Sequence, residues 1–195
     1  MKKIKGTIVL FSVFFMSVLF SGCNYNAIVE EGEAVDAQWA NVENRYQERN
    51  DLIPNLVATV KGYAKQESEV YTQVAEARSK AGGVVNINAS DSASMKEFQK
   101  VQSEVSSSLQ RLIAVSESYP ELKSDQNFRD LQNQLEGIEN RIATERKRYN
   151  DAVRTYNSHI KKFPINLFAS KFGFEAKSYF QAVEGASKAP TVSFD

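Results

Sequence analysis

Cysteine and histidine are nearly absent from this chain, which has one of each, Cys23 and His159. A single cysteine excludes an intramolecular disulfide, so apolar packing must hold the fold together. A single histidine excludes a metal centre built from histidines, and the chain has neither a His-Glu-x-x-His nor a Gly-x-Ser-x-Gly motif. Without a nucleophile beside a base, or a metal site, the sequence predicts no enzymatic activity and no cofactor.

Net charge is absent too, because 24 Lys and Arg residues balance 24 Asp and Glu residues. Proteins that bind nucleic acid neutralise phosphates with an excess of basic residues. The one dense basic cluster, Arg146-Lys147-Arg148, has the composition of a solvated helix face. The sequence therefore predicts that nucleic acid is not a partner.

A short apolar run begins the chain. Lysines precede it, it extends over Thr7–Phe20, and Ser21 and Gly22 then lead directly to Cys23. This layout is typical of a bacterial lipoprotein signal peptide. We therefore predict that residues 1–22 are cleaved and that Cys23 is acylated, with palmitate among the acyl chains. Each buried CH₂ group would contribute about 0.8 kcal/mol to membrane anchoring.

Two alternatives remain for this segment, an uncleaved membrane anchor and a soluble N-terminal helix. A transmembrane helix needs about 20 apolar residues, and this run is shorter. The lipoprotein interpretation places the protein at the cell envelope outside the cytoplasm, facing the periplasm rather than the cell surface. The membrane is then a partner through the lipid on Cys23.

The rest of the chain repeats apolar residues at spacings of three and four, which is typical of amphipathic helices. Helices are predicted at about residues 27–80, 94–119, 125–163 and 166–185. Stripes this narrow must be buried against other helices, and short connections make successive helices antiparallel. We expect an all-α fold, an antiparallel up-and-down bundle of four helices, two of them long, in one domain of residues 23–195.

Pro54 lies within the first predicted helix. The seven-residue spacing of apolar positions keeps its phase across Pro54, which predicts one helix over residues 27–80 with a kink at the proline. The alternative is a helix that starts again after Asn50 or Asp51, with Pro54 in its first turn.

The same region places a charge on the apolar stripe. Arg49 occupies a stripe position, and a buried charge without a partner is very costly. Asp51, Glu117 and Glu139 are candidate partners. Two interpretations remain, a structural kink held by an ion pair and a cleft that binds a partner.

Two Tyr-Asn pairs lie seven residues apart, Tyr149-Asn150 and Tyr156-Asn157. Asparagine in the core of a bundle can set the register of neighbouring helices. We therefore predict hydrogen bonds between helices at Asn150 and Asn157.

Several strings resemble the LemA family of bacterial envelope proteins. They are RNDLIPNLVATVKGYAKQE (Arg49 to Glu67), SESYPELKS (Ser116 to Ser124), LQNQLEGIENRI (Leu131 to Ile142), RYNDAVRTYN (Arg148 to Asn157) and APTVSFD (Ala189 to Asp195). The resemblance implies a helical, antiparallel four-helix bundle outside the cytoplasm, with no established enzymatic activity or cofactor. Many members carry a transmembrane helix, so Cys23 suggests a lipoprotein variant.

The predicted function is that of a non-enzymatic, membrane-anchored scaffold or interaction module for another, unidentified envelope protein. The candidate interaction motif consists of Arg49, Asp51, Pro54, Asn55, Tyr119, Pro120, Asn150 and Asn157. The alternative is a membrane-organising or lipid-associating oligomer, because the aromatic segment Phe163–Phe180 contains several lysines.

Overall fold

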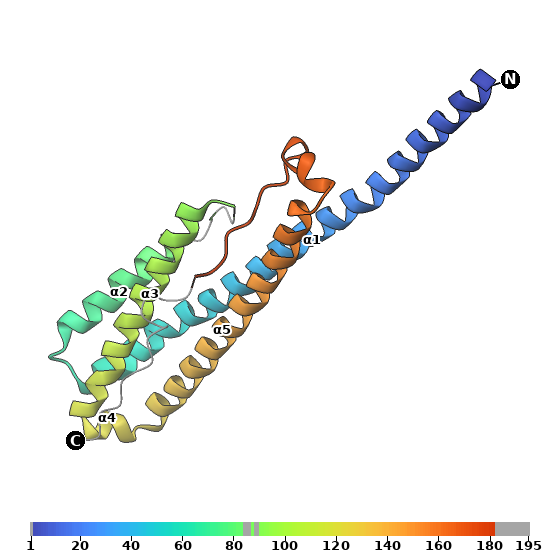
Figure 1. The fold of residues 1–195 in the computed structure, drawn as a ribbon. Helices are drawn as coiled ribbons and strands as arrows, with labels where there is room; N and C mark the ends of the chain where they lie inside the picture. Colours follow the sequence, from blue (N-terminus) through green and yellow to red (C-terminus); the bar gives the residue numbers. More distant parts are fainter. Residues whose placement is uncertain (1, 84–86, 88–89, 182–195) are drawn as a thin grey trace, which may run out of the picture.

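The computed structural model describes the backbone of residues 2–83, 87 and 90–181, and the side chains from Tyr25 onward within these ranges. Every regular element of the described backbone is helical (Figure 1), which confirms the all-α prediction. The α-helices are α1 (Lys2–Tyr63), α2 (Ser68–Gly83), α3 (Ser92–Val115), α4 (Pro120–Ser124) and α5 (Gln126–Lys161). Three short 3₁₀ helices are η1 (Ser116–Ser118), η2 (Ile165–Leu167) and η3 (Ala169–Phe172).

The long helices pack in two pairs, with α1 beside α5 and α2 beside α3 (Figure 1). One apolar cluster surrounds Trp39 and joins α1, α5 and the start of α3. A second cluster, around Leu112, joins the end of α1 to α2, α3, α4 and the first half of α5. The predicted stripe of the first helix is buried at Val35, Val42 and other positions. The N-terminal part of α1 projects beyond both clusters (Figure 1).

The first predicted helix, over residues 27–80, is wrong in its extent. The helix continues through Pro54, so the alternative of a new start after Asn50 is also wrong, but α1 ends at Tyr63. The carbonyl oxygen of Asn50, which Pro54 deprives of its helical donor, accepts a hydrogen bond from Arg78 Nε at 3.2 Å.

The break between α1 and α2 falls at Ala64, which is fully buried. The Tyr71 hydroxyl donates to the Ala64 carbonyl oxygen at 2.5 Å, so this carbonyl, which has no donor within α1, gains a partner. The break sequence Ala-Lys-Gln-Glu consists of helix-forming residues, which explains why no local signal predicted it. The break lets α2 bury Tyr71, Val74, Ala77 and Ala81.

The predicted helices at 94–119 and 125–163 correspond to α3 and α5, with different ends. Asp91 begins α3 by accepting hydrogen bonds from the N–H groups of Ala93 and Ser94, both at 3.0 Å. Asp125 begins α5 by accepting from the N–H of Phe128 at 2.8 Å. Pro120 takes the first position of α4, where a missing N–H costs nothing.

The predicted fourth helix at 166–185 is wrong. After η2 and η3, Gly173 adopts a left-handed conformation with φ of 78°, which glycine tolerates without strain. Residues 174–181, here called the return segment, then run back along α5 without regular secondary structure (Figure 1). The last four residues of the predicted helix lie outside the described part of the chain, as does the string APTVSFD.

Candidate interaction groove

Two asparagines on α5 hold the backbone of the return segment. The amide of Asn157 donates from Nδ2 to the carbonyl oxygen of Lys177 at 2.8 Å, and its Oδ1 accepts from the Lys177 N–H at 2.9 Å. Asn150 makes the same pair of bonds to Phe180, at 3.0 and 2.9 Å. An amide side chain offers both a donor and an acceptor, so each asparagine satisfies a whole backbone unit. The predicted hydrogen bonds between helices at these positions are therefore wrong.

The spacing of the two asparagines matches that of the backbone they hold. Seven residues of α-helix rise about 10.5 Å. The two residues held in the return segment are three apart, and an extended chain covers about 10 Å in three residues. One heptad of α5 therefore binds three residues of extended chain, which runs in the opposite direction to α5.

Further polar side chains, on α5 and α3, also form hydrogen bonds with the backbone of the return segment. The Tyr149 hydroxyl donates to the carbonyl oxygen of Ser178 at 3.0 Å, and burial raises the pKa of Tyr149 well above its usual range. The hydroxyl therefore remains a donor at neutral pH. The N–H of Gln181 bonds to Gln99 Oε1 on α3 at 2.9 Å, and Arg146 donates to the Gln181 carbonyl oxygen at 3.1 Å.

Phe180 fixes the return segment in the core. Its ring stacks on Trp39 with centroids 5.7 Å apart and meets Tyr149 edge-on at 5.4 Å. The Arg146 guanidinium lies 4.8 Å from the ring centroid on the outer side. Phe180 thus completes an aromatic cluster that α1, α3 and α5 leave open.

An open groove of about 800 Å³ begins where the return segment reaches Gln181. Tyr46 and Arg49 contribute from α1, and Glu139, Ile142 and Arg146 from α5. The α3 wall consists of polar side chains: Lys96, Gln99, Lys100, Gln102, Ser103, Ser106, Ser107 and Gln110. The return segment therefore occupies one end of this channel, and no described residue fills the other end.

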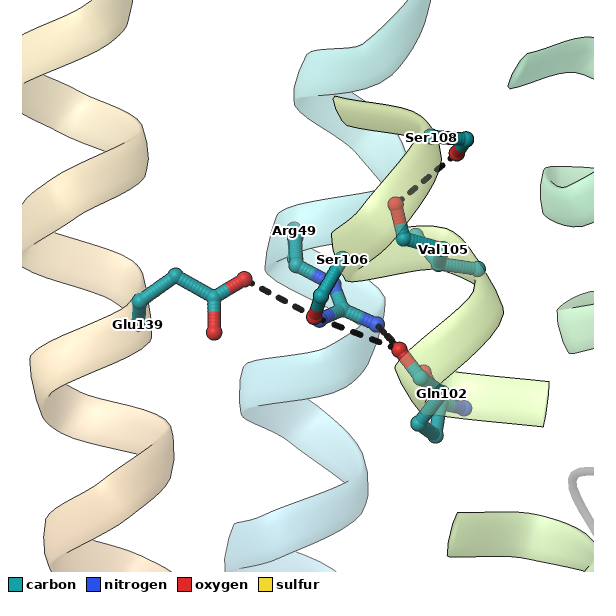
Figure 2. Close-up of polar contacts among 6 residues, drawn as sticks. All are labelled: Arg49, Gln102, Val105, Ser106, Ser108 and Glu139. Atoms are coloured by element: carbon teal, nitrogen blue, oxygen red, sulfur yellow. Dashed lines mark hydrogen bonds and ion pairs between the residues drawn. The ribbon is translucent and has the colours of Figure 1, made fainter. Parts of the chain in front are cut away.

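Arg49 lies at the base of this groove and reaches both walls (Figure 2). Only 1% of its side chain is exposed. The guanidinium donates to Gln102 Oε1 at 2.5 Å and to Ser106 Oγ at 2.9 Å, and it pairs with Glu139 at 3.0 Å. Charge-assisted bonds of this kind are stronger than neutral ones, so Arg49 ties three helices together.

Of the three candidate partners of Arg49, the structure selects Glu139. Asp51 is exposed and accepts instead from Gln47 Nε2 at 2.8 Å. Glu117 pairs with Lys123 at 2.6 Å, away from the groove. The Arg49 guanidinium also lies 5.0 Å from the centroid of the Tyr46 ring.

The groove is electropositive. Among the described residues that line it, four are cationic, Arg49, Lys96, Lys100 and Arg146, and one is a carboxylate, Glu139. A concave surface lined by one sign of charge concentrates ligands of the opposite sign. The groove is therefore suited to a ligand that carries carboxylates and backbone carbonyl groups.

The structure does not bring the predicted motif together in one place. Pro54 and Asn55 are exposed on α1, outside the groove. The Tyr119 hydroxyl donates to Glu67 at 3.3 Å, and Pro120 starts α4 beside it. The α3 side chains that line the groove were missed, because polar residues on a helix carry no signal that separates a groove from a solvated face.

The described residues offer no candidate metal site near the groove. Within the described part of the chain, no group of three or more His, Cys, Asp or Glu side chains is placed to hold a metal ion. His159 Nδ1 lies 3.0 Å from Glu31 and links the end of α5 to α1. Among the residues described with their side chains, no helix has the length and apolar composition needed to cross a membrane.

Comparison with known proteins agrees with the resemblance read from the strings. A family model described as "LemA family" matches residues 38–194. Two relatives from Paramagnetospirillum magneticum, named Magnetosome protein MamQ 2 and MamQ 1, are each 30% identical over 192 residues, covering 89% of this chain and 70% of theirs. Magnetosome protein MamQ of Magnetospirillum gryphiswaldense is 28% identical over 191 residues, covering 88% of this chain and 69% of its own.

Proposed function

Because the chain belongs to the LemA family, we propose that it is a non-enzymatic, membrane-anchored module that binds an extended segment of another envelope protein in the groove between α3 and α5. Its fold is helical, and its family is membrane-associated. The partner, the lipid anchor and the extracytoplasmic location are the proposed parts.

The observation that carries this proposal is the bound return segment. The amides of Asn150 and Asn157 bond only to backbone groups of Phe180 and Lys177, so these bonds do not depend on the side chains held. The Phe180 ring adds a contact that does depend on its side chain. The groove beyond Gln181 continues along the same two helices and offers further amides and hydroxyls on α3. A second extended chain would find the same kinds of partner there.

The charge of the groove narrows the class of partner. The four cations and one carboxylate among the described lining residues favour a segment with acidic side chains. Lys96 and Lys100 lie on α3 within the groove and are the side chains best placed to select for carboxylates, because Arg49 already has protein partners.

The anchor accounts for where this binding would occur. A lipid on Cys23 would hold the N-terminus of α1 at the membrane and leave the bundle outside the cytoplasm, facing the periplasm. In this proposal the long helices form an antiparallel up-and-down bundle that begins next to the membrane.

A photo-crosslinking amino acid at Ser107, in the full chain in its native membrane, tests the proposal. Ser107 is exposed in the groove, and Gln134, exposed on α5 and not part of the groove, is the control position. We expect one dominant protein adduct from Ser107, absent from Gln134 and reduced at least several-fold when Lys96 and Lys100 are changed to Glu. The same adducts from both positions would refute binding in the groove. So would a yield of the Ser107 adduct that does not change when Lys96 and Lys100 are changed to Glu.

A second candidate is a membrane-organising or lipid-associating oligomer. Two observations favour it, the relatives named as magnetosome proteins and the exposed aromatic side chains beyond α5. In the same experiment, adducts consisting only of lipid or of a second copy of this chain would support this candidate over the groove.

A further inference from the structure

Four large apolar side chains that follow α5 lie in solvent. Phe163 is 80% exposed, Leu167 57%, Phe168 49% and Phe172 61%. Leu167 and Phe172 lie in the 3₁₀ helices η2 and η3, and Phe163 and Phe168 flank η2. The return segment follows directly, and its Phe180 is only 5% exposed. A cluster of exposed apolar side chains on a folded domain marks an interaction surface.

This surface lies next to the first described side chain of α1. The ring of Tyr25 meets that of Phe172 edge-on with centroids 5.7 Å apart, and that of Phe174 at 5.4 Å. Tyr25 and Val29 are themselves 44% and 37% exposed. The turns that carry these side chains lie where α1 leaves the bundle (Figure 1), beside Tyr25.

The sequence of α1 relates this place to the membrane. Tyr25 follows Cys23 by two residues and Phe20, the end of the apolar run, by five. Five residues of helix span about 7.5 Å. Whether a lipid on Cys23 or the uncleaved apolar run enters the bilayer, Tyr25 lies at the membrane surface.

The charges around the surface match those of a lipid headgroup layer. Lys161, Lys162 and Lys171 are exposed within or beside the four apolar side chains. The nearby carboxylate of Glu31 lies 3.0 Å from His159 Nδ1. Aromatic rings bordered by lysines are the composition of protein surfaces that enter the membrane interface.

We propose that this surface, the aromatic foot (residues 163–172 with Tyr25), inserts into the interface of the bilayer that holds the N-terminus. The foot is a second attachment beside the anchor. Two attachments at one end of the bundle fix its tilt and rotation relative to the membrane, which a single anchor at the end of a helix cannot do. This inference concerns a different surface from the groove and does not depend on it.

Tryptophan fluorescence in vesicles with brominated acyl chains tests the foot. The full chain, with Phe168→Trp, is reconstituted into vesicles of phosphatidylethanolamine and phosphatidylglycerol. Tyr63→Trp is the matched control, since Tyr63 is 41% exposed and lies about 57 Å along α1 from Tyr25. The buried Trp39 gives the same background in every variant.

We expect the brominated chains to quench the added fluorescence of Phe168→Trp by about half, because interfacial side chains reach about 5–10 Å into the acyl boundary. The fluorescence of Tyr63→Trp stays unchanged. Absence of quenching at position 168, or equal quenching at both positions, would overturn the proposal.

A second variant separates insertion from simple proximity. Phe163→Trp reports the depth of the foot in a chain that also carries Leu167→Asp and Phe168→Asp, all at exposed positions. We expect at least a two-fold loss of quenching relative to Phe163→Trp alone, with an unchanged helical circular dichroism spectrum. Unchanged quenching would show that the foot does not carry the insertion. Crosslinking from Ser107 stays intact in this variant, so failure of the foot and failure of the groove are distinguishable.

Discussion

Arg78 of α2 donates to the carbonyl oxygen in α1 that Pro54 leaves without a helical donor. The acceptor is the Asn50 carbonyl, 3.2 Å from Arg78 Nε, and Asn50 is buried. An unpaired buried carbonyl is costly, so Arg78 compensates for the proline and ties α2 to the middle of α1. Pro54 therefore creates an interhelical bond rather than an end to the helix.

This relationship predicts strong coupling between the two positions. Arg78→Ala leaves the Asn50 carbonyl unpaired and should lower the free energy of unfolding by about 1–2 kcal/mol. In a Pro54→Ala chain, the new N–H at position 54 bonds that carbonyl, and Arg78→Ala should then cost less than about 0.5 kcal/mol. Urea unfolding of the four chains measures the coupling. Equal costs in both backgrounds would contradict it.

Loss of the asparagine amides should release the return segment locally. Asn157→Ala removes two bonds from half-buried backbone groups and should lower the free energy of unfolding by about 2 kcal/mol. Hydrogen exchange should speed up at the amide of Lys177, while Asn150→Ala should have its effect at Phe180. Asn140→Ala, exposed on the same helix, is the control and should change stability by less than about 0.5 kcal/mol. Uniform exchange changes along the segment would argue against separate roles.

Arg49 should matter more for its bonds to α3 than for its ion pair. Arg49→Ala leaves Gln102 without its donor and opens a cavity, which should cost about 3 kcal/mol. Glu139→Gln should cost less than about 1 kcal/mol, because 40% of the Glu139 side chain is exposed. Thermal or urea unfolding compares them, with Arg49→Met as a variant that keeps most of the volume. Equal losses for the Arg49→Ala and Glu139→Gln chains would show that the ion pair dominates.

Stability should fall at alkaline pH in part through Tyr149. Burial raises the pKa of Tyr149 above its ordinary value of about 10, so its contribution is complete below pH 10 and is lost as pH rises toward the folded-state pKa. Each pH unit above 10 should remove about 1.4 kcal/mol from the wild type. Tyr149→Phe loses the bond to Ser178, about 1 kcal/mol at pH 8, but escapes the alkaline loss. Urea unfolding at pH 8, 10 and 11 should show the difference narrow and then change sign, so that Tyr149→Phe is slightly the more stable chain at pH 11. A constant difference would refute this account.

The all-α class and two of the long helices could be predicted because their signals are local. α3 and α5 lie close to their predicted ranges, with aspartate caps at both starts. The apolar spacing also places Val35, Trp39 and Val42 in the core, where they are buried. Helical periodicity and capping are properties of neighbouring residues, so sequence alone contains them.

The candidate site could be predicted only in part from the sequence. Arg49 lies on an apolar stripe, and because a buried charge without a partner is costly, the sequence indicates that it has a polar partner. The sequence does not distinguish between the three candidate acids. The choice of Glu139, 90 residues away, depends on how α5 packs against α1. The two asparagines were recognised as unusual, yet their partners belong to a segment that was expected to be a helix.

The break at Ala64 and the path of the return segment were decided by tertiary structure. The residues around Ala64 favour a helix, and it ends there because α2 must bury its apolar side chains against α3. The return segment has no regular hydrogen bonding of its own and takes its partners from α5 and α3, at least 20 residues away in sequence. Periodicity reports which residues prefer burial, whereas the neighbour that buries them is set by packing between distant parts of the chain.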